Sequence, residues 1–417
     1  MRRVPTILVG ACLVVVWLAT SAQATGARPC QFDTRRDVPS DFVERCSAVI
    51  ADGTLSGESL AWAYGARASF YAEREERDLA IADLDKAIAV SPTAFLHVFR
   101  GILVKGTGDE DKAFGDFEEA IRLDPGYADA YTLRASIHFT RDRFGLALDD
   151  LNVAVRLDPR SVGAYFLRGG VYAATGESDR AIFDFSAAIQ INPSFDGAYR
   201  GRASAYSALG DHERSWADYS AVVRLRPYDG TGYLGRALES VFLNDLSSAM
   251  RDLNASIALD AKGARAFMAR GAILADQGAF ADALADFEQA LELEPNSIAA
   301  YLGRAQVNIR TRRYTAAMSD LDTAIALDAN DARPYALRGP LNSLLGDQNA
   351  AMADYDTAVR LNPLDATSYY NRGAAHVIRR EYDRAVADLE TALRLQPGYE
   401  QARAALDIIK MFHRPSL

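Results

Sequence analysis

The chain has 417 residues, of which 49% are hydrophobic and 24% charged, and its formal net charge is −10 at pH 7. This apolar content excludes an intrinsically disordered chain, and the acidic balance argues against nucleic acid as a partner because phosphates repel it. Three cysteines and five histidines leave little material for a metal cluster. We therefore expect neither a metal nor another cofactor. At about 150 residues per domain, the length predicts roughly three domains.

The first segment, residues 1–24, has the pattern of a secretory signal peptide. Arg2 and Arg3 precede an apolar run that ends at Leu18, and the sequence Ala-Gln-Ala ends at Ala24. This pattern predicts cleavage after Ala24 and export of the protein to the periplasm or beyond the cell. Two alternatives are an uncleaved membrane anchor and lipidation of Cys12, although the apolar run is short for a span and continues past Cys12. No later stretch is apolar enough to predict a transmembrane segment.

Two cysteines, Cys30 and Cys46, remain after that cleavage. In an oxidising compartment such a pair is most simply a disulfide, and the alternative is two free thiols. A bond closing this short loop would restrain the N-terminal segment by about 3 kcal/mol in the chain-entropy model. Residues 40–50 in the same segment are expected to form a helix that caps the rest of the chain.

An arginine and an aspartate each recur at a fixed spacing through most of the sequence, and we call these two series the charged columns. In each column only the first interval is one residue shorter than the others. The residue after each arginine is always Ala or Gly, and Pro closes most units. Ten copies in phase cannot arise from composition, so the chain is built of repeats. The arginines are Arg67, Arg100, Arg134, Arg168, Arg202, Arg236, Arg270, Arg304, Arg338 and Arg372, and the aspartates are Asp83, Asp116, Asp150, Asp184, Asp218, Asp252, Asp286, Asp320, Asp354 and Asp388.

Each unit contains two amphipathic stretches with helical spacing, for example residues 198–209 and 215–225. Small residues between them allow two antiparallel helices to approach closely, and the closing proline ends the second helix. One such pair cannot bury its apolar face alone, so stacking of neighbouring pairs must supply the core. The pattern therefore predicts an all-α fold without one large core.

The residues of a typical unit, Ala198 to Ala203 followed by Ala221 to Pro227, resemble the tetratricopeptide repeat (TPR). The resemblance covers residues 61–397 and implies a right-handed α-solenoid of about ten helix–turn–helix repeats with capping helices. The expected organisation is a signal peptide at 1–24, an N-terminal capping segment at 25–60, the repeats, and a C-terminal capping helix and tail at 398–417.

The resemblance implies a non-enzymatic scaffold that binds a protein or peptide in a concave groove, and the signal-peptide pattern adds the expectation that it acts in the cell envelope. The candidate groove residues vary between copies on the inner face of each first helix. Apolar side chains with occasional arginines would suit an amphipathic helix or an extended peptide bearing acidic groups, unless they pack against adjacent repeats. They are Trp62, Phe95, Phe139, Phe166, Arg200, Leu234, Leu238, Val241, Phe242, Met268, Leu302, Ile309, Arg310 and Tyr370, with Val377 and Ile378 in the last copy.

The repeated polar columns are interpreted as scaffold rather than chemistry. Each arginine is expected to pair with an aspartate of its own or the neighbouring helix pair, and a tyrosine column is expected to pack between helices. The alternative function is carbohydrate binding or exopolysaccharide export, in which groove aromatics stack on sugars. No phosphate-binding loop and no Ser/His/Asp set is recognisable, so we expect no enzymatic activity.

Overall fold

The computed structural model of the protein describes Cys30 and residues 41–412. The predicted signal peptide, its cleavage site after Ala24 and the lipidation alternative at Cys12 lie outside the described residues. None of the described helices is long and apolar enough to cross a membrane.

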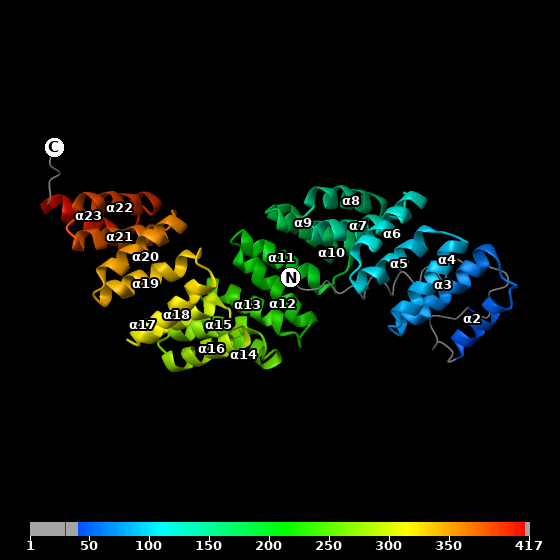
Figure 1. Cartoon of the computed structure of the whole chain (residues 1–417), viewed down its shortest axis with the longest axis horizontal. Helices are drawn as coiled ribbons and strands as arrows, with labels where there is room; N and C mark the ends of the chain where they lie inside the picture. The colour runs from blue at the N-terminus through cyan, green and yellow to red at the C-terminus, as the bar shows by residue number, and fades with distance from the viewer. Residues whose placement is uncertain (1–29, 31–40, 413–417) are drawn as a thin grey trace. The chain divides into compact units, whose positions relative to one another are not determined.

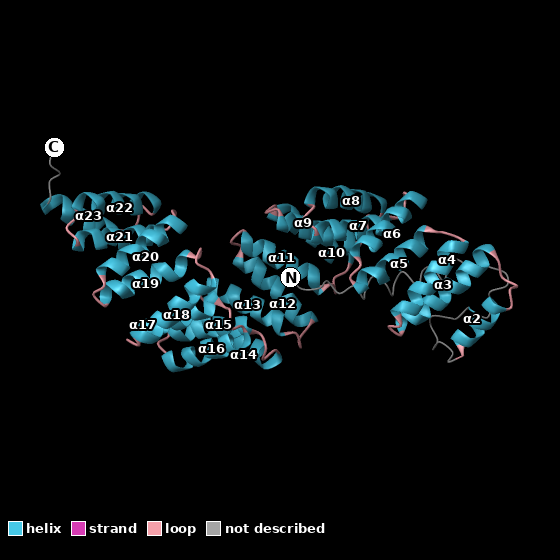
Figure 2. Cartoon of the chain, in the orientation of Figure 1, coloured by secondary structure: helices cyan, strands magenta, loops and turns pink. Residues whose placement is uncertain are grey.

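The described residues form 22 helices and no strand, so the prediction of an all-α repeat solenoid is confirmed (Figures 1 and 2). Twenty helices form ten helix–turn–helix pairs. The first helices are α3 (Gly57–Glu73), α5 (Ala94–Thr107), α7 (Ala128–Thr140), α9 (Val162–Ala174), α11 (Asp196–Ala208), α13 (Gly230–Phe242), α15 (Ala264–Asp276), α17 (Ile298–Arg310), α19 (Ala332–Leu344) and α21 (Ala366–Ile378). The second helices are α4 (Arg77–Val90), α6 (Glu110–Leu123), α8 (Phe144–Leu157), α10 (Ser178–Ile191), α12 (His212–Leu225), α14 (Leu246–Leu259), α16 (Phe280–Leu293), α18 (Tyr314–Leu327), α20 (Gln348–Leu361) and α22 (Tyr382–Leu395).

The chain divides into two compact units, residues 1–221 and residues 222–417. The boundary lies within α12, so it falls close to the end of the fifth repeat. In each unit, every helix pair contacts the next one along the chain. The core is therefore a row of small apolar clusters shared between neighbours, instead of the single large core that the length alone would allow.

The small-residue columns are buried where the helices of a pair approach each other. A Cβ added to Gly169 would lie 2.9 Å from the ring of Phe185, and one added to Gly201 of the next repeat would lie 2.6 Å from the same ring. In the third repeat, Ala135 packs instead in a cluster with Leu151. A larger second-helix side chain is thus accommodated by a smaller first-helix residue, which keeps the packing dense.

A capping helix lies at each end of the array, as the sequence predicts. α2 (Phe42–Ala51) buries Phe42 and Cys46 against the first repeat. α23 (Glu400–Phe412) buries Leu406 and Ile409 in a cluster with Leu389 of α22. The two helices therefore cover the apolar faces that the terminal repeats would otherwise expose.

Cys30 and Cys46 are two fully buried free thiols in this structure, with no bond joining them. They are hydrogen-bonded to each other, which lowers the pKa of Cys30 and raises that of Cys46. The two side chains predicted to pair are therefore neighbours, and the disulfide itself stays a prediction.

The turns between the two helices of a pair share one left-handed residue. Five repeats have glycine there, at Gly108, Gly176, Gly210, Gly278 and Gly346. The other five repeats carry a side chain in the same conformation, at Glu75, Asp142, Asn244, Arg312 and Arg380. Asp and Asn adopt this conformation at little cost, whereas other L-residues pay more, so the turn itself does not explain Glu75, Arg312 or Arg380.

Candidate functional site

The arginine and aspartate columns form one ladder inside the repeats. In the fourth repeat, Arg168 donates from Nε to Asp184 Oδ2 at 2.7 Å and from Nη2 to Oδ1 at 2.8 Å. These hydrogen bonds raise the pKa of the Arg168 guanidinium, and the Asp184 side chain is 1% exposed. The same two-pronged contact occurs in Arg67–Asp83, Arg100–Asp116, Arg134–Asp150, Arg168–Asp184, Arg202–Asp218, Arg236–Asp252, Arg270–Asp286, Arg304–Asp320, Arg338–Asp354 and Arg372–Asp388.

The partner is always the aspartate of the arginine's own repeat, which decides between the two pairings that the sequence leaves open. The remaining nitrogen, Nη1, reaches the second helix of the preceding repeat: Arg168 donates to Asn152 Oδ1 at 2.9 Å, and Arg270 to Asn254 Oδ1 at 2.7 Å. Each of these two guanidinium groups therefore binds within its own repeat and to its neighbour. Because the planar guanidinium groups bind both repeats, we assign the arginine column a structural role.

Tyrosines three residues before the column arginines, such as Tyr131, Tyr165 and Tyr199, form the tyrosine column and pack against the same guanidinium groups. The guanidinium carbon of Arg168 is 5.5 Å from the ring centre of Tyr165, and that of Arg202 is 5.7 Å from the ring centre of Tyr199. The Tyr131 hydroxyl donates to the carbonyl of Pro125 at 3.2 Å. These rings are used for cation–π and packing contacts within the array, as expected of scaffold residues.

Three histidines are buried in separate repeats. His97 Nδ1 lies 3.1 Å from Asp116 Oδ1, and His376 Nδ1 lies 2.8 Å from Glu381 Oε2. His138 packs edge-on against Phe114 with ring centres 5.2 Å apart, and its Nδ1 has no partner. Within the described part of the chain, no group of three or more His, Cys, Asp or Glu side chains could hold a metal ion.

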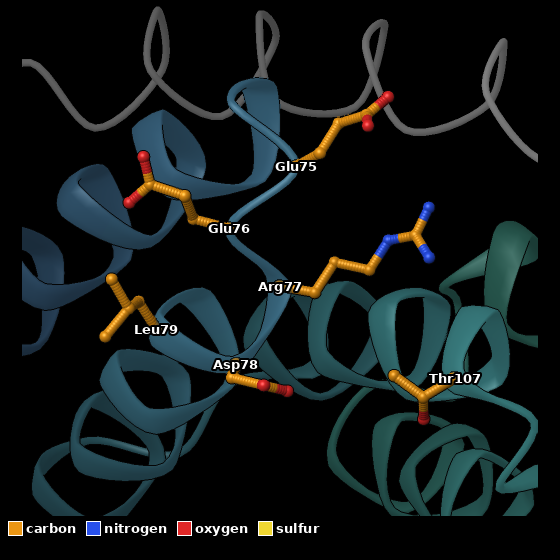
Figure 3. Close-up of a pocket in the computed structure, with 6 residues that line it drawn as sticks. All are labelled: Glu75, Glu76, Arg77, Asp78, Leu79 and Thr107. Carbon is orange, nitrogen blue, oxygen red and sulfur yellow. The ribbon is translucent and has the colours of Figure 1, made fainter.

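A surface hollow of about 410 Å³ lies at the turn between α3 and α4 (Figure 3). Its lining residues are largely exposed, and Leu79 points away from the side where Arg77 and Thr107 lie. A ligand there would contact charged groups without burying much apolar surface, so the hollow lacks the character of a small-molecule site. It is lined by Glu75, Glu76, Arg77, Asp78, Leu79 and Thr107.

Two predicted groove residues are buried and cannot contact a partner directly. Trp62 is 4% exposed because α2 covers it, in a cluster that includes Phe42. Leu302 is 7% exposed and packs with Leu321 and Leu341 of the adjoining helices. For these two positions the prediction is wrong, because neighbouring helices cover the inner face there.

The other predicted groove residues are at least partly accessible. Phe242 is 67% exposed, Val241 38%, and the Arg310 side chain 46%. Phe166 is half-buried against Phe195, with ring centres 4.9 Å apart. The remaining half-buried members are Phe95, Phe139, Arg200, Leu234, Leu238, Met268, Ile309, Tyr370 and Val377, and Ile378 is exposed.

Sequence reasoning missed several large exposed side chains, among them Leu344, Leu345, Ile408 and Met411, at 62%, 52%, 58% and 74% exposure. Leu344 stands six residues after its column arginine, as Phe242 and Ile378 do. Counting positions from the column would have found it. Ile408 and Met411 lie on the C-terminal capping helix, where the arginine column ends and the register is easily lost.

Comparisons with known proteins agree with this geometry. Four sequence profiles described as tetratricopeptide or TPR repeats match residues 100–196 and 234–298, 274–339, 344–377, and 366–399. A search of curated protein sequences gives no significant match.

Solved structures align with this chain at low sequence identity, and one of the three described next reaches a TM-score above 0.5. The Cut9–Hcn1 hetero-tetramer of the APC/C aligns at a TM-score of 0.51 with 15% identity, over 81% of this chain and 85% of that one. A tetratricopeptide repeat protein from Parabacteroides merdae gives 0.49 with 19% identity, over 62% of this chain and 98% of that one. Yeast Tom70 gives 0.44 with 14% identity, over 85% and 96%.

Proposed function

Because the chain belongs to the tetratricopeptide repeat family, we propose that it is an exported scaffold that binds a protein partner on the exposed face of its first helices. The fold supports protein–protein interaction in general, and TPR proteins are generally non-enzymatic scaffolds. The face, the export and the absence of catalysis are the parts that we propose for this chain.

The single observation that carries the binding face is the exposure of large apolar side chains in one register. Phe242, Leu344 and Ile378 each stand six residues after a column arginine, and each is at least 59% exposed. The copies between Phe242 and Leu344 carry Asp276 and Arg310 in this register, so its contiguous apolar part is Leu344 and Ile378. Contiguous exposed apolar surface is a common mark of an interaction surface. The ladder behind them is fully paired, so the face is preformed and loses little ordering entropy on binding.

Carbohydrate binding has less support from the same contacts. Stacking on sugars needs open aromatic faces, whereas the tyrosine column is occupied by the arginines of the ladder. Of the three large apolar side chains exposed in this register, Leu344 and Ile378 are aliphatic and Phe242 is aromatic. We therefore propose a protein or peptide partner.

Export is proposed from the N-terminal pattern alone. Arg2 and Arg3, the apolar run and the site at Ala24 are the features that a signal peptidase would recognise. Mass spectrometry of the protein from fractionated cells tests this proposal. We expect a chain that starts at Thr25 in the envelope or secreted fraction, and an intact N-terminus in the cytosol would contradict it.

The binding face is tested by site-specific photo-cross-linking in cells. A benzophenone amino acid replaces Phe242 in one variant and Phe183 in the other. Phe183 is a matched control because it is 69% exposed but lies on the second helix α10. We expect a discrete cross-linked product from position 242 that is absent from position 183 and is lost in a Leu238→Glu variant. Identical products from both positions would refute the proposed face.

A further inference from the structure

Five arginines gather at helix–helix turns within the last three repeats. Arg310, Arg312 and Arg313 lie at the α17–α18 turn, and Arg379 and Arg380 lie at the α21–α22 turn. We call these five residues the arginine edge. The chain as a whole carries a formal charge of −10, so this edge is a local exception to its electrostatics.

The turns do not need these arginines. Arg312 and Arg380 have φ of 60° and 64°, at the position where five other repeats have glycine. Such a conformation costs an L-residue about 1–2 kcal/mol relative to the right-handed region. Arg313 is the N-cap residue of α18 and makes no side-chain cap, whereas Asp347 caps α20 from the equivalent position. A cation at a helix N-terminus also opposes the helix dipole.

Contacts within the protein account for only part of the arginine edge. Arg379 donates to Asn349 Oδ1 at 3.0 Å and lies 3.9 Å from Glu381, and the guanidinium carbon of Arg310 lies 4.9 Å from the ring centre of Phe280. Arg310 lies 3.5 Å from Asp276, a pair whose side chains are 46% and 84% exposed, and such exposed pairs contribute little. Across the described residues, Arg312, Arg313 and Arg380 form no ion pair. Residues that break local preferences without an internal gain point to a contact outside the molecule.

An apolar patch adjoins the arginine edge. Leu344 is the last residue of α19 and Leu345 is its C-cap. Because α19 packs between α17 and α21, the two leucines lie between the two arginine turns. The patch continues on α21 with Ile378. Its exposed members are Leu344 at 62%, Leu345 at 52% and Ile378 at 59%.

We propose that the arginine edge and the apolar patch together bind an acidic amphipathic helix of a partner protein. The proposal rests on the proposed scaffold function and names the site and chemistry of its partner. Leucine, isoleucine or phenylalanine side chains of the bound helix would cover the patch, while its aspartates and glutamates accept hydrogen bonds from the guanidinium groups. An anionic membrane surface is disfavoured because the remainder of the chain is acidic and would be repelled.

The test uses the mature full-length chain and a fluorescein-labelled synthetic peptide with leucines on one helical face and glutamates beside them. The peptide is longer than about 15 residues, so that it can form a helix. A second probe replaces every glutamate with lysine. Anisotropy titrations compare the unaltered protein, Arg312→Glu/Arg380→Glu and Arg360→Glu/Arg394→Glu. The last variant makes the same charge change on second-helix arginines of the same unit. Circular dichroism confirms that each variant is folded.

We expect the acidic probe to bind at least about tenfold more tightly than the lysine probe. We also expect the affinity for the acidic probe to fall at least about tenfold in Arg312→Glu/Arg380→Glu. In the control variant Arg360→Glu/Arg394→Glu, that affinity should change by less than about twofold. Equal binding of both probes, no binding of the acidic probe, or equal losses in both variants would overturn the proposal. Binding to mixed phosphatidylserine and phosphatidylcholine vesicles that needs the arginine edge would overturn it in favour of a membrane. If the cross-link from position 242 persists in any of these cases, the scaffold function stands and only this site fails.

Discussion

Arg202 and Asp218 hold the two helices of the fifth repeat together, and the same arginine also reaches the preceding repeat. Nε and Nη2 of Arg202 donate to the two carboxylate oxygens of Asp218, both at 2.8 Å, and Nη1 donates to Ser186 Oγ at 2.9 Å. The Asp218 side chain is 8% exposed, so it depends on this arginine to satisfy its charge. The Arg202 side chain therefore stabilises both its own repeat and the contact with the preceding repeat.

Replacement of Arg202 by alanine should destabilise the fifth repeat by about 3 kcal/mol, because it leaves the Asp218 carboxylate buried without a counter-charge. Arg202→Lys should lower the free energy of unfolding by less, since lysine keeps the charge but cannot form the bidentate contact. Hydrogen exchange of the α11 and α12 amides, together with urea unfolding, measures the loss. The charge swap Arg202→Asp/Asp218→Arg should recover part of it, whereas Arg202→Asp/Asp184→Arg should recover nothing. Equal recovery by both swaps would contradict the pairing.

The ring of Phe185 sets the size limit at Gly201. An added Cβ would lie 2.6 Å from the ring, so Gly201→Ala should destabilise by about 1–2 kcal/mol despite the better helix propensity of alanine. In Gly201→Ala/Phe185→Leu the overlap is removed, and a double-mutant cycle from thermal unfolding should show favourable coupling.

Gly170 is the control for that cycle. It lies in the neighbouring first helix α9, with nothing within 4 Å of an added Cβ. Gly170→Ala should therefore be neutral or stabilising. An equal loss at Gly170 and Gly201 would show that backbone effects decide, rather than the aromatic ring.

His138 should make the stability depend on pH. Burial lowers the pKa of His138, and nearby Arg134 acts in the same direction while Asp150 opposes it. The unfolded chain then takes up this proton at a higher pH than the folded protein. The contribution of His138 is therefore complete above about pH 6.5 and is lost as the pH falls below that value. The free energy of unfolding, measured with urea, should differ less between pH 7.5 and pH 5 for His138→Tyr than for the unaltered protein. Tyrosine is chosen because Tyr172 occupies the equivalent position of the next repeat. An unchanged difference would exclude His138 as the source.

The cysteine pair should be oxidised in protein taken from an oxidising compartment. Cys30 and Cys46 are fully buried neighbours, so a thiol oxidoreductase acting during folding could join them with loss of two protons and two electrons. The unfolded mature chain should then show no reactive thiol before reduction and two afterwards. Reduction should lower stability by about 3 kcal/mol, while Cys30→Ser/Cys46→Ser should not respond to the reductant. Two reactive thiols before reduction would contradict the bond.

The repeats and their helices could be predicted from the sequence because the ladder and the small-residue columns recur in every copy. The expected stretches at 198–209 and 215–225 correspond to α11 and α12 within three residues at each end. The partner of each arginine could not be chosen from spacing. For Arg202, both Asp218 of its own repeat and Asp184 of the preceding repeat lie on second helices. Only the helix packing distinguishes them.

The proposed binding face was harder to predict, because the exposure of a side chain depends on which neighbouring helix lies across from it. Trp62 and Leu302 were expected on the accessible inner face but are covered by adjoining helices. Ile408 and Met411 of the capping helix α23 are exposed, and no repeat register indicated them. A repeat pattern predicts which side of a helix a residue occupies, but the neighbours decide whether solvent reaches it.

The third hydrogen bond of these ladder arginines has its acceptor on the preceding second helix or cap, so the two ends of the array are not equivalent. Arg67 donates to Ser47 of α2, Arg168 to Asn152 and Arg372 to Asp356, in each case toward the N-terminus. Trimming from the N-terminal end therefore strips a guanidinium of one acceptor, whereas trimming from the C-terminal end only frees an acceptor that water can satisfy. Shortened versions of this protein should tolerate loss of their last repeats, with α23 re-attached as a cap, better than loss of their first.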